Sequence, residues 1–258
     1  MLFVLSPAKS LDEAPLADKV KTTQPLFGEQ SQVLIDVLRE KSPQDIATLM
    51  HLSDKLSALN VARYQVWQAK PKASSSKPAA LMFNGDVYDG LDAKSLDNEG
   101  LAWAQDHLCI LSGLYGVLRP LDALQPYRLE MGTQLVNPQG KNLYQFWGAH
   151  IAEYLNKRLA KATEPVLVNL ASEEYFKAVD RRALKARVVT CVFEDFKGGR
   201  YKIISFFAKR ARGLMMRWAI DQRVRKVDEL RGFDAQGYRF DADVSSADRW
   251  VFRRKELA

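Results

Sequence analysis

Short apolar runs alternate with longer stretches of helical periodicity along the 258-residue chain. The runs at 2–5, 108–111 and 166–170 hold four or five apolar residues and end near small polar ones, which is typical of buried strands. A further strand is predicted at 79–83, just before an Asn-Gly-Asp sequence. Because helical patterns separate these runs, we expect an α/β (α+β) protein, with a single domain and a mixed sheet flanked by helices.

Three helices are predicted in the first part of the chain. The first covers 29–41, where the apolar residues share one face. Ser42-Pro43 begins a second, because Ser is a favoured N-cap and Pro fits the first helical position. Ser53 is predicted to cap a third helix, from 54 to 67. The last two helices could form a helix-hairpin-helix DNA-binding element at about 43–66, but their hairpin lacks the usual glycines, so a plain helical hairpin is the alternative.

The second half of the chain continues this alternation. A hairpin is predicted around Lys197-Gly198-Gly199, because adjacent glycines permit the backbone of a tight turn. Its strands are expected at 187–193 and 201–207, followed by a helix that ends near Arg225. The other elements expected here are one long helix at 143–159 and antiparallel strands at 238–240 and 250–252.

Two stretches are expected to be irregular. The segment KPKASSSKP at 70–78 is predicted to be a surface loop or linker. The stretch 109–132 reads CILSGLYGVLRPLDALQPYRLEMG, in which prolines and glycines prevent one long helix. It is expected to be a strand end followed by an ordered loop. The charged residues Arg119, Asp122, Arg128 and Glu130 could form a structural ion-pair network there, or a pocket for an anion with a carboxylate for proton transfer.

Small polar residues follow four of the predicted strands. Ligands of open α/β sheets bind beyond the carboxyl ends of the strands, so these exits are predicted to line one cleft. The alternative is that strand ends are polar wherever they occur. The exits are Ser6, Asn84-Gly85-Asp86, Ser112-Gly113, Asn169 and Ser172. The candidate charged groups of this cleft are Lys9, Asp86, Arg119, Arg128, Glu130, Glu174 and Lys177.

Composition places the chain among ordinary globular proteins, with 47% hydrophobic and 27% charged residues. The two cysteines, Cys109 and Cys191, lie in apolar runs and favour buried thiols over a disulfide framework. No apolar stretch approaches the length of a membrane span, and the opening MLFVLSPAK resembles a first strand more than a signal peptide. A cytoplasmic location without membrane contact is expected.

The strongest charge signal lies between 197 and 226. This segment contains ten Lys or Arg residues and a single acidic residue, Asp221. Its local charge of +9 therefore exceeds the +7 of the whole chain. The helical pattern places apolar residues on one face and basic residues on the other. Gly213 among them would allow close approach of another backbone or of a phosphate. Arginines on such a face bind phosphates, although a solvated basic face is the alternative.

Motifs for metals, cofactors and nucleophiles are missing from the sequence. His51, His107 and His150 lie far apart, and there is no HExxH or CxxC sequence. A zinc or iron site is therefore unsupported. The chain also lacks a Walker loop, a GxGxxG sequence and a recognisable nucleophile–histidine arrangement. We expect no cofactor and no metal.

Several motifs together resemble the YaaA family of bacterial peroxide-stress proteins. The resemblance extends from residue 1 to GYRF at 237–240, and the block at 111–132 is its most specific part. One departure is Asn84, where the family often carries Lys. The motifs are SPAKSL at 6–11, GDVYDGL at 85–91, LSGLYGVLRPLDALQPYRLEMG at 111–132, LYQFWG at 143–148, NLASEEYFK at 169–177 and ISFFAKRARGLMMRW at 204–218.

This resemblance implies a protein that helps bacteria to resist hydrogen peroxide by keeping unincorporated iron low. It also implies DNA binding, with a positively charged cleft and a helix-hairpin-helix element in one mixed α/β domain. On this hypothesis the protein binds DNA phosphates, as duplex or distorted duplex, and has no catalysis of its own. The residues that would contact DNA are Lys55, Arg63, Lys209, Arg210, Arg212 and Arg217.

Two further hypotheses are open from the sequence. One is an enzyme that acts on a nucleobase or nucleotide in the cleft at the strand ends. Its candidate groups are Lys9, Asp86, Arg128, Glu130 and Glu174. The other is direct binding of iron, which the lack of a ligand cluster disfavours.

Overall fold

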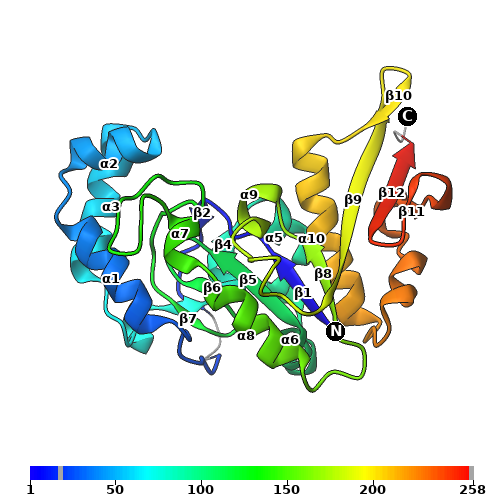
Figure 1. The fold of residues 1–258 in the computed structure, drawn as a ribbon, viewed down its shortest axis with the longest axis horizontal. Helices are drawn as coiled ribbons and strands as arrows, with labels where there is room; N and C mark the ends of the chain where they lie inside the picture. The colour runs from blue at the N-terminus through cyan, green and yellow to red at the C-terminus, as the bar shows by residue number, and fades with distance from the viewer. Residues whose placement is uncertain (17–19, 256–258) are drawn as a thin grey trace.

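Parallel strands form the middle of the main sheet (Figure 1). The computed structural model describes residues 1–16 and 20–255. In sheet order these strands are β12 (Arg249–Lys255), β9 (Arg187–Lys197), β8 (Val166–Leu170), β1 (Leu2–Leu5) and β5 (Leu108–Ser112). Every residue of β1, β5 and β8 is buried, as expected for strands inside a parallel sheet that is covered on both faces. The strands predicted at 2–5, 108–111 and 166–170 are confirmed.

Antiparallel strands complete the sheet and make it mixed. They are β6 (Gly116–Leu118) on β5, β10 (Arg200–Lys202) on β9, and β11 (Arg239–Phe240) on β12. Two short ladders lie outside the main sheet and pair β2 (Ser10–Leu11) with β4 (Phe83–Asn84), and β3 (Lys77–Pro78) with β7 (Ala123–Leu124). The chain therefore forms one α/β domain, as its sequence pattern predicts.

Some helices pack on the sheet, and others form one end of the molecule. The α-helices are α1 (Gly28–Arg39), α2 (Pro43–Met50), α3 (Asp54–Val66), α4 (Ala79–Met82), α5 (Asp86–Leu91), α6 (Asn98–His107), α7 (Leu143–Trp147), α8 (His150–Leu159), α9 (Glu173–Phe176) and α10 (Ser205–Asp221). The helices α6, α8 and α10 contact β1. The helices α1 to α3 lie at the opposite end of the molecule from β9, β12 and α10 (Figure 1). In the described ranges, no helix has the length and apolar character that crossing a membrane requires.

The helical hairpin of α2 and α3 follows from local sequence signals. The Ser42 side chain accepts a hydrogen bond from the Asp45 backbone at 3.2 Å, and the Asp45 carboxylate accepts one from the Ser42 backbone at 2.9 Å. This reciprocal pair is a capping box. His51 closes α2 in the left-handed conformation, and α3 begins directly after Ser53. The hairpin predicted at about 43–66 is present; the fold does not test its role in DNA binding.

Two expected elements differ from the structure. Residues 79–82 form the helical turn α4 instead of a strand. The backbone of Ala79 and Ala80 bonds to the carbonyls of Asp122 and Pro120, so the loop at 109–132 provides the partners that a neighbouring strand would have given. The helix expected at 143–159 is divided into α7 and α8, because Gly148 adopts a φ of 44° that ends the first helix.

The region after the 198–199 turn also differs from expectation. The predicted hairpin exists, with β9 on one side and β10 on the other. Its second strand, however, ends at Lys202, and α10 already begins at Ser205. Residues 205–207 belong to the helical pattern of α10, in which Ala208, Ala211 and Met215 are buried, so they do not extend the strand. The final helix also stops at Asp221 instead of reaching Arg225.

The segment at 70–78 ends inside the fold. Its last residues form β3, and Lys77 is 6% exposed. The Lys77 ammonium donates hydrogen bonds to the carbonyls of Asp12 and Ala14 at 2.8 and 2.9 Å. This buried cation ties the segment to the chain that follows β1.

Candidate functional site

The carboxyl ends of β1, β5 and β8 meet at one edge of the sheet, because the three strands are parallel neighbours. The Ser6 hydroxyl, after β1, accepts a hydrogen bond from the Ser172 backbone at 2.8 Å and lies 3.2 Å from the Ser172 hydroxyl. The β2–β4 ladder adds Asn84 to this edge by pairing it with Ser10. The structure therefore brings together the strand exits that the sequence singles out.

Three of the candidate charged groups meet in one ionic cluster. The Glu130 carboxylate lies 3.1 Å from the Lys9 ammonium and 3.0 Å from the Arg128 guanidinium. Its side chain is 15% exposed, and the Tyr64 hydroxyl donates a hydrogen bond to the Arg128 carbonyl. Each charge in this cluster thus has a partner, which is the arrangement of a structural network.

Glu174 and Asp86 lie apart from that cluster. The Glu174 carboxylate accepts a hydrogen bond from the Gly132 backbone at 3.0 Å. Asp86 begins α5 and makes no ion pair with any residue in the described ranges. Of the three carboxylates of the enzyme hypothesis, Glu130 is therefore paired and Glu174 holds the loop at Gly132, while Asp86 has no ion pair within the described residues.

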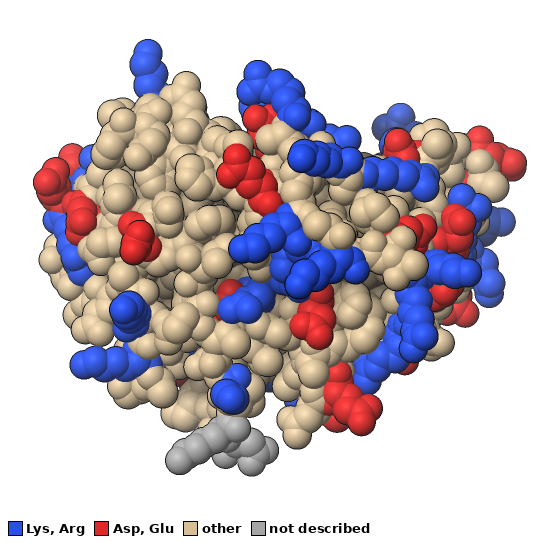
Figure 2. Space-filling model, turned by 60° about the horizontal axis from the view of Figure 1, so that its bottom comes forward, with Lys and Arg blue, Asp and Glu red and all other residues tan. Residues whose placement is uncertain are grey.

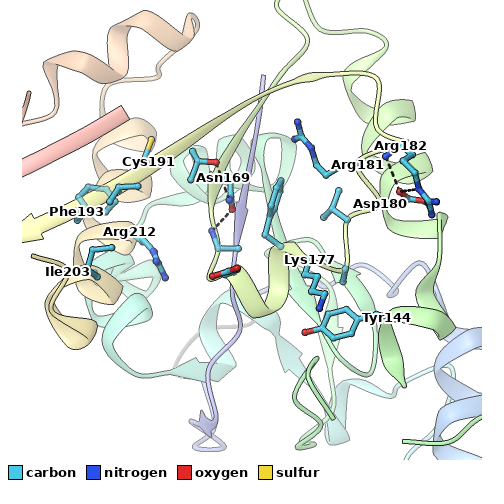
Figure 3. A pocket seen from close by; sticks show the side chains of 18 of the residues that line it. Tyr144, Asn169, Lys177, Asp180, Arg181, Arg182, Cys191, Phe193, Ile203 and Arg212 are labelled. Atoms are coloured by element: carbon cyan, nitrogen blue, oxygen red, sulfur yellow. Dashed lines mark hydrogen bonds and ion pairs between the residues drawn. The ribbon is translucent and has the colours of Figure 1, made fainter. Parts of the chain in front are cut away.

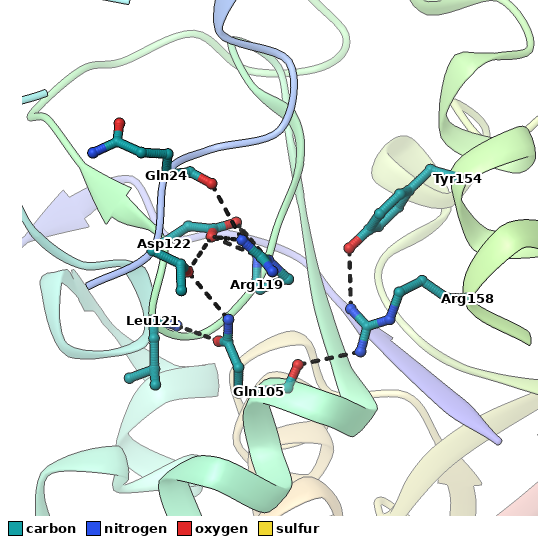
Figure 4. A network of polar contacts seen from close by, with 8 residues as sticks. Gln24, Gln105, Arg119, Leu121, Asp122, Tyr154 and Arg158 are labelled. Atoms are coloured by element: carbon teal, nitrogen blue, oxygen red, sulfur yellow. Dashed lines mark hydrogen bonds and ion pairs between the residues drawn. The ribbon is translucent and has the colours of Figure 1, made fainter. Parts of the chain in front are cut away.

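Arg119 and Asp122 belong to a second network (Figure 4). Asp122 is 1% exposed, and its carboxylate accepts hydrogen bonds from the Arg119 backbone at 2.7 Å and from the Thr23 hydroxyl at 2.6 Å. The Arg119 guanidinium lies 2.8 Å from the same carboxylate. Arg119 therefore fixes the loop, and its charge is already compensated.

A pocket of about 700 Å³ opens between the ends of α9 and α10 and the strands β8 and β9 (Figure 3). The apolar residues Val179, Cys191 and Phe193 are part of its lining, and each is at most 3% exposed. Asn169, at the end of β8, lies 3.5 Å from the Thr190 hydroxyl of β9, and its oxygen accepts a hydrogen bond from the Ala171 backbone at 2.9 Å. The basic residues of the wall are Lys177, Arg181, Arg182 and Arg212, and the acidic ones are Glu173 and Asp180.

Arg212 is the unusual member of this wall. Its Nε atom is buried and has no hydrogen-bond partner within the described chain, and burial lowers the pKa of its guanidinium. No carboxylate of residues 1–16 or 20–255 lies within ion-pair distance of the Arg212 guanidinium. The Arg212 residue as a whole is half-buried and lines the pocket, so an anion there would pair with the terminal nitrogens of the guanidinium, not with the buried Nε atom.

The remaining basic side chains of the pocket differ in their partners. The Lys177 ammonium lies 5.1 Å from the centre of the Tyr144 ring, and the Arg181 guanidinium lies 6.0 Å from that of Phe176. Arg182, by contrast, forms an ion pair with Asp180 at 3.3 Å and is 93% exposed. Arg212 lies on the α10 side and Lys177 on the α9 side, with Asn169 between them (Figure 3).

The start of α10 adds to the positive character of the pocket. Ile203 and Ala208 line the pocket on either side of this start. Among residues 1–16 and 20–255, no side chain caps the N-terminus of α10, and its first turn has no acidic residue. Free backbone N–H groups and the helix dipole both favour an anion at such an end.

The expected basic face of α10 is only partly present. This helix is buried over much of its circumference, because it packs between β9 and α5. Arg217 is held by the Asp221 carboxylate at 2.9 Å and the Ser95 hydroxyl at 2.6 Å. Arg210 donates to the Gln236 side chain at 3.4 Å, and Lys209 is exposed. Among these candidates, it is Arg212 that reaches the pocket.

The two candidates of the helical hairpin lie far from the pocket. Lys55 is exposed near the start of α3. Arg63 pairs with Glu13 and donates to Asn60 at 3.3 Å. Figure 2 shows Lys and Arg in the centre and on the right of the face it presents, with Asp and Glu beside them. The basic residues on that face are therefore spread among acids and do not form one uninterrupted patch.

Some pocket residues gave no signal in the sequence. Thr190 lies within a strand, and Arg181 follows a helix of only four residues, so periodicity could not mark either of them. The predicted strand exit at the end of β8 indicates Asn169 and Lys177 as candidate site residues. Arg212 was found by its charge, but it was expected on a solvent-facing surface.

Comparison with known proteins identifies a family that matches most of the chain. A family described as "Peroxide stress protein YaaA" matches residues 1–244. The chain belongs to this family. A UPF0246 protein of Polaromonas sp. is 67% identical over the whole of both chains, and one of Albidiferax ferrireducens is 65% identical over 99% of each. A UPF0246 protein of Bordetella pertussis is 59% identical over 99% of this chain and all of its own. The resemblance seen in the sequence motifs is confirmed.

For a peroxide stress protein, the placement of acids, histidines and cysteines is of interest. Within the described residues, no group of three such side chains is arranged to hold a metal ion. Cys109 and Cys191 are buried and free, and burial raises the pKa of both thiols, that of Cys109 to about 11.

Proposed function

We propose that this peroxide stress protein binds DNA and helps to keep unincorporated iron low. DNA phosphates would enter the positively charged pocket, where Arg212 and Lys177 provide charge. Fe(II) reduces hydrogen peroxide to hydroxide and hydroxyl radical, so a lower level of free iron would spare DNA and protein. Membership of the peroxide stress family supports a role in peroxide stress, in which a lower level of free iron would be protective.

The unpartnered Arg212 guanidinium is the observation that carries the DNA-binding part. Arg212 lines the pocket, and its guanidinium forms no ion pair with any carboxylate of the described residues. Phosphate and carboxylate groups both accept two parallel hydrogen bonds from a planar guanidinium group. The unpaired guanidinium therefore suits an anionic ligand, and DNA would provide one in its phosphates.

Exposed cations near the pocket would provide further contacts to DNA phosphates. Lys197, Arg200 and Lys202 lie on the β9–β10 hairpin and are exposed, and Lys209 is exposed one turn into α10. No Asp or Glu occurs from residue 197 to residue 220. Charges of this kind attract nucleic acid without sequence preference.

The helical hairpin could provide a second contact. The backbone N–H groups at the start of α3 and the exposed Lys55 side chain are suited to one phosphate. This contact lies at the other end of the molecule from the pocket (Figure 1). Both would be engaged together only by a long or bent duplex.

A binding experiment tests the DNA part of the proposal. Fluorescence anisotropy of a labelled duplex at low ionic strength should give saturable binding. Arg212→Gln should weaken it about tenfold or more, which is the effect of losing one charge-assisted hydrogen bond. Arg182→Gln is the matched control, because Arg182 lies on the same wall but is exposed and paired with Asp180. Lack of duplex binding by the unmodified protein would refute this part.

A cellular experiment tests the iron part. Electron paramagnetic resonance of a bacterium that lacks this gene should show more chelator-accessible iron during peroxide stress than the parent strain. The unmodified gene should restore the lower level, and Arg212→Gln should restore it incompletely. An equal level of free iron with and without the gene would refute the role in iron limitation.

A further inference from the structure

We infer that a second pocket, at the amino edge of the main sheet, binds a small anion with two or more carboxylate or phosphate groups. This edge lies opposite the strand exits described above, because β1, β5 and β8 run parallel to one another. The inference is independent of DNA binding and concerns a different set of residues.

Four segments of the chain form this pocket, whose volume is about 720 Å³. They are the start of β1 at Leu2, the end of α6 at Asp106 and His107, the turn between α8 and β8 at 161–164, and the segment after α10 at 224–226. A volume of this size lies in the range of pockets that hold small organic ligands. The lining shares no residue with the pocket beside α9.

Positive charge is in excess in this second pocket. Its lining carries four cations and two carboxylates, and none of these six side chains forms an ion pair within residues 1–16 and 20–255. An anion with two or more negative groups would balance the charges that this part of the chain leaves uncompensated. The cations are Arg158, Lys161, Arg225 and Lys226, and the carboxylates are Asp106 and Glu164.

Arg158 is held in place by neutral oxygen atoms. Its guanidinium donates hydrogen bonds to the carbonyls of Gln105 and Asp106 at 3.2 and 2.5 Å, and to the Tyr154 hydroxyl at 3.0 Å. These bonds use three of the five N–H donors of the group and fix its orientation without neutralising its charge. A cation that is already fixed loses little conformational freedom when it binds an anion.

Glu164 joins two segments of the pocket wall. Its carboxylate accepts a hydrogen bond from the Val227 backbone at 2.7 Å, which ties the turn between α8 and β8 to the segment after α10. This contact keeps Arg225 and Lys226 in the same lining as Lys161. All three cations are exposed, so their side chains can turn toward an anion in the pocket.

His107 provides a spectroscopic signal at the pocket itself. Its ring stacks on Trp103 with 4.0 Å between the ring centres, and its Nδ1 atom donates a hydrogen bond to the Trp103 carbonyl at 2.8 Å. Because this ring is fixed and lines the pocket, its NMR resonances should respond to an anion bound there. The other two histidines, His51 and His150, lie outside the lining and serve as internal controls.

Titration with two probe anions tests the inference. Citrate represents the carboxylate class and pyrophosphate the phosphate class, and acetate is the monovalent control. We expect at least one of the two probes to shift the His107 ring resonances saturably, while those of His51 and His150 stay unchanged. It should bind at least about tenfold more tightly than acetate, since one additional charge-assisted hydrogen bond is worth a factor of this size.

Variants at the exposed cations distinguish a site from general attraction by a basic surface. Arg225→Gln combined with Lys226→Gln should weaken binding about tenfold or more and leave the fold intact, because both side chains are exposed. Lys157→Gln combined with Lys185→Gln is the matched control, since it removes the same charge at exposed positions outside the lining. Equal weakening by the two double variants would overturn the inference.

Two other results would also overturn it. If neither probe shifted the His107 resonances, the four cations would only balance the negative carboxyl ends of α6 and α8. If a short DNA duplex displaced the bound probe, the pocket would belong to a surface that contacts DNA. Lack of duplex binding by the protein, in contrast, would refute the proposed DNA binding and leave this inference standing.

Discussion

Gly213 of α10 packs so closely on Val87 of α5 that a Cβ atom on Gly213 would stand 1.8 Å from the Val87 carbonyl oxygen. The contact is reciprocal, since a Cβ atom on Gly90 of α5 would stand 2.2 Å from the Arg210 carbonyl oxygen. The sequence predicts that Gly213 allows close approach of either another backbone or a phosphate. The structure shows that the backbone of α5 makes this approach. It also fixes the rotation of α10, and with it the direction in which Arg212 points.

Replacing Gly213→Ala should destabilise the protein. No rotamer change can relieve a clash between a Cβ atom and backbone, so the two helices must separate, at a cost of about 2 kcal/mol or more in the free energy of unfolding. Urea denaturation would measure it. Gly232→Ala is the control, because the nearest atom to its Cβ would be 3.8 Å away on the Trp218 ring; similar losses for both variants would contradict this explanation.

Arg212→Met should have opposite effects on stability and binding. Methionine fills similar space without a buried charge, so the free energy of unfolding should rise by about 1 kcal/mol. Affinity for DNA should fall. Thermal unfolding and anisotropy on the same preparation would test both. A loss of stability would mean that Arg212 has a structural partner and would remove the main argument for an anionic ligand.

Asp12 should contribute to the loss of stability in acid. A hydrogen bond from the Lys94 side chain, helped by the Ala14 backbone and by the charge of Lys77, lowers the pKa of Asp12 to about 2. Because this pKa is lower in the folded than in the unfolded protein, the stabilisation is complete above about pH 5 and is lost progressively as the pH falls through about 2. Asp12→Asn should therefore make stability less dependent on pH in that window. Urea titrations at several pH values, with Asp36→Asn as a control at an exposed carboxylate, would show it, and equal slopes for wild type and Asp12→Asn would refute it.

The two thiols should be inert toward peroxide in the folded protein. Cys109 and Cys191 are 0% and 3% exposed, and burial raises the pKa of both thiols. Since the thiolate is the reactive form, neither should react at neutral pH. Mass spectrometry after peroxide treatment, with urea-unfolded protein as the reactive control, would test this. Rapid oxidation of the folded protein would make it a candidate thiol sensor instead.

Local signals in the sequence predicted local structure well. The capping residue Ser42 and the glycine turn at 198–199 have the expected geometry, because each depends on neighbours in the chain. The strand expected at 79–83 failed for the opposite reason: distant backbone at Pro120 and Asp122 decided its conformation.

The site could be predicted only in part. Residues after buried strands were foreseeable, since parallel strands bring their ends together, and this located Asn169 and Lys177. The pairing of Lys9 with Glu130, and the lack of a partner for Arg212, depend on contacts between segments more than 80 residues apart or on packing around α10. Charge density alone could not separate Arg212 from Arg217, of which the second is held by Asp221.

The salt dependence of duplex binding tests the central claim most directly. The affinity of the unmodified protein should fall steeply with ionic strength, since each phosphate contact releases counterions from DNA. Arg212→Gln should bind more weakly and lower the slope of log K against log salt by about one, as expected for one lost phosphate contact, whereas Arg182→Gln should match the unmodified protein. Unchanged affinity and slope in Arg212→Gln would contradict the assignment of this pocket to DNA phosphate.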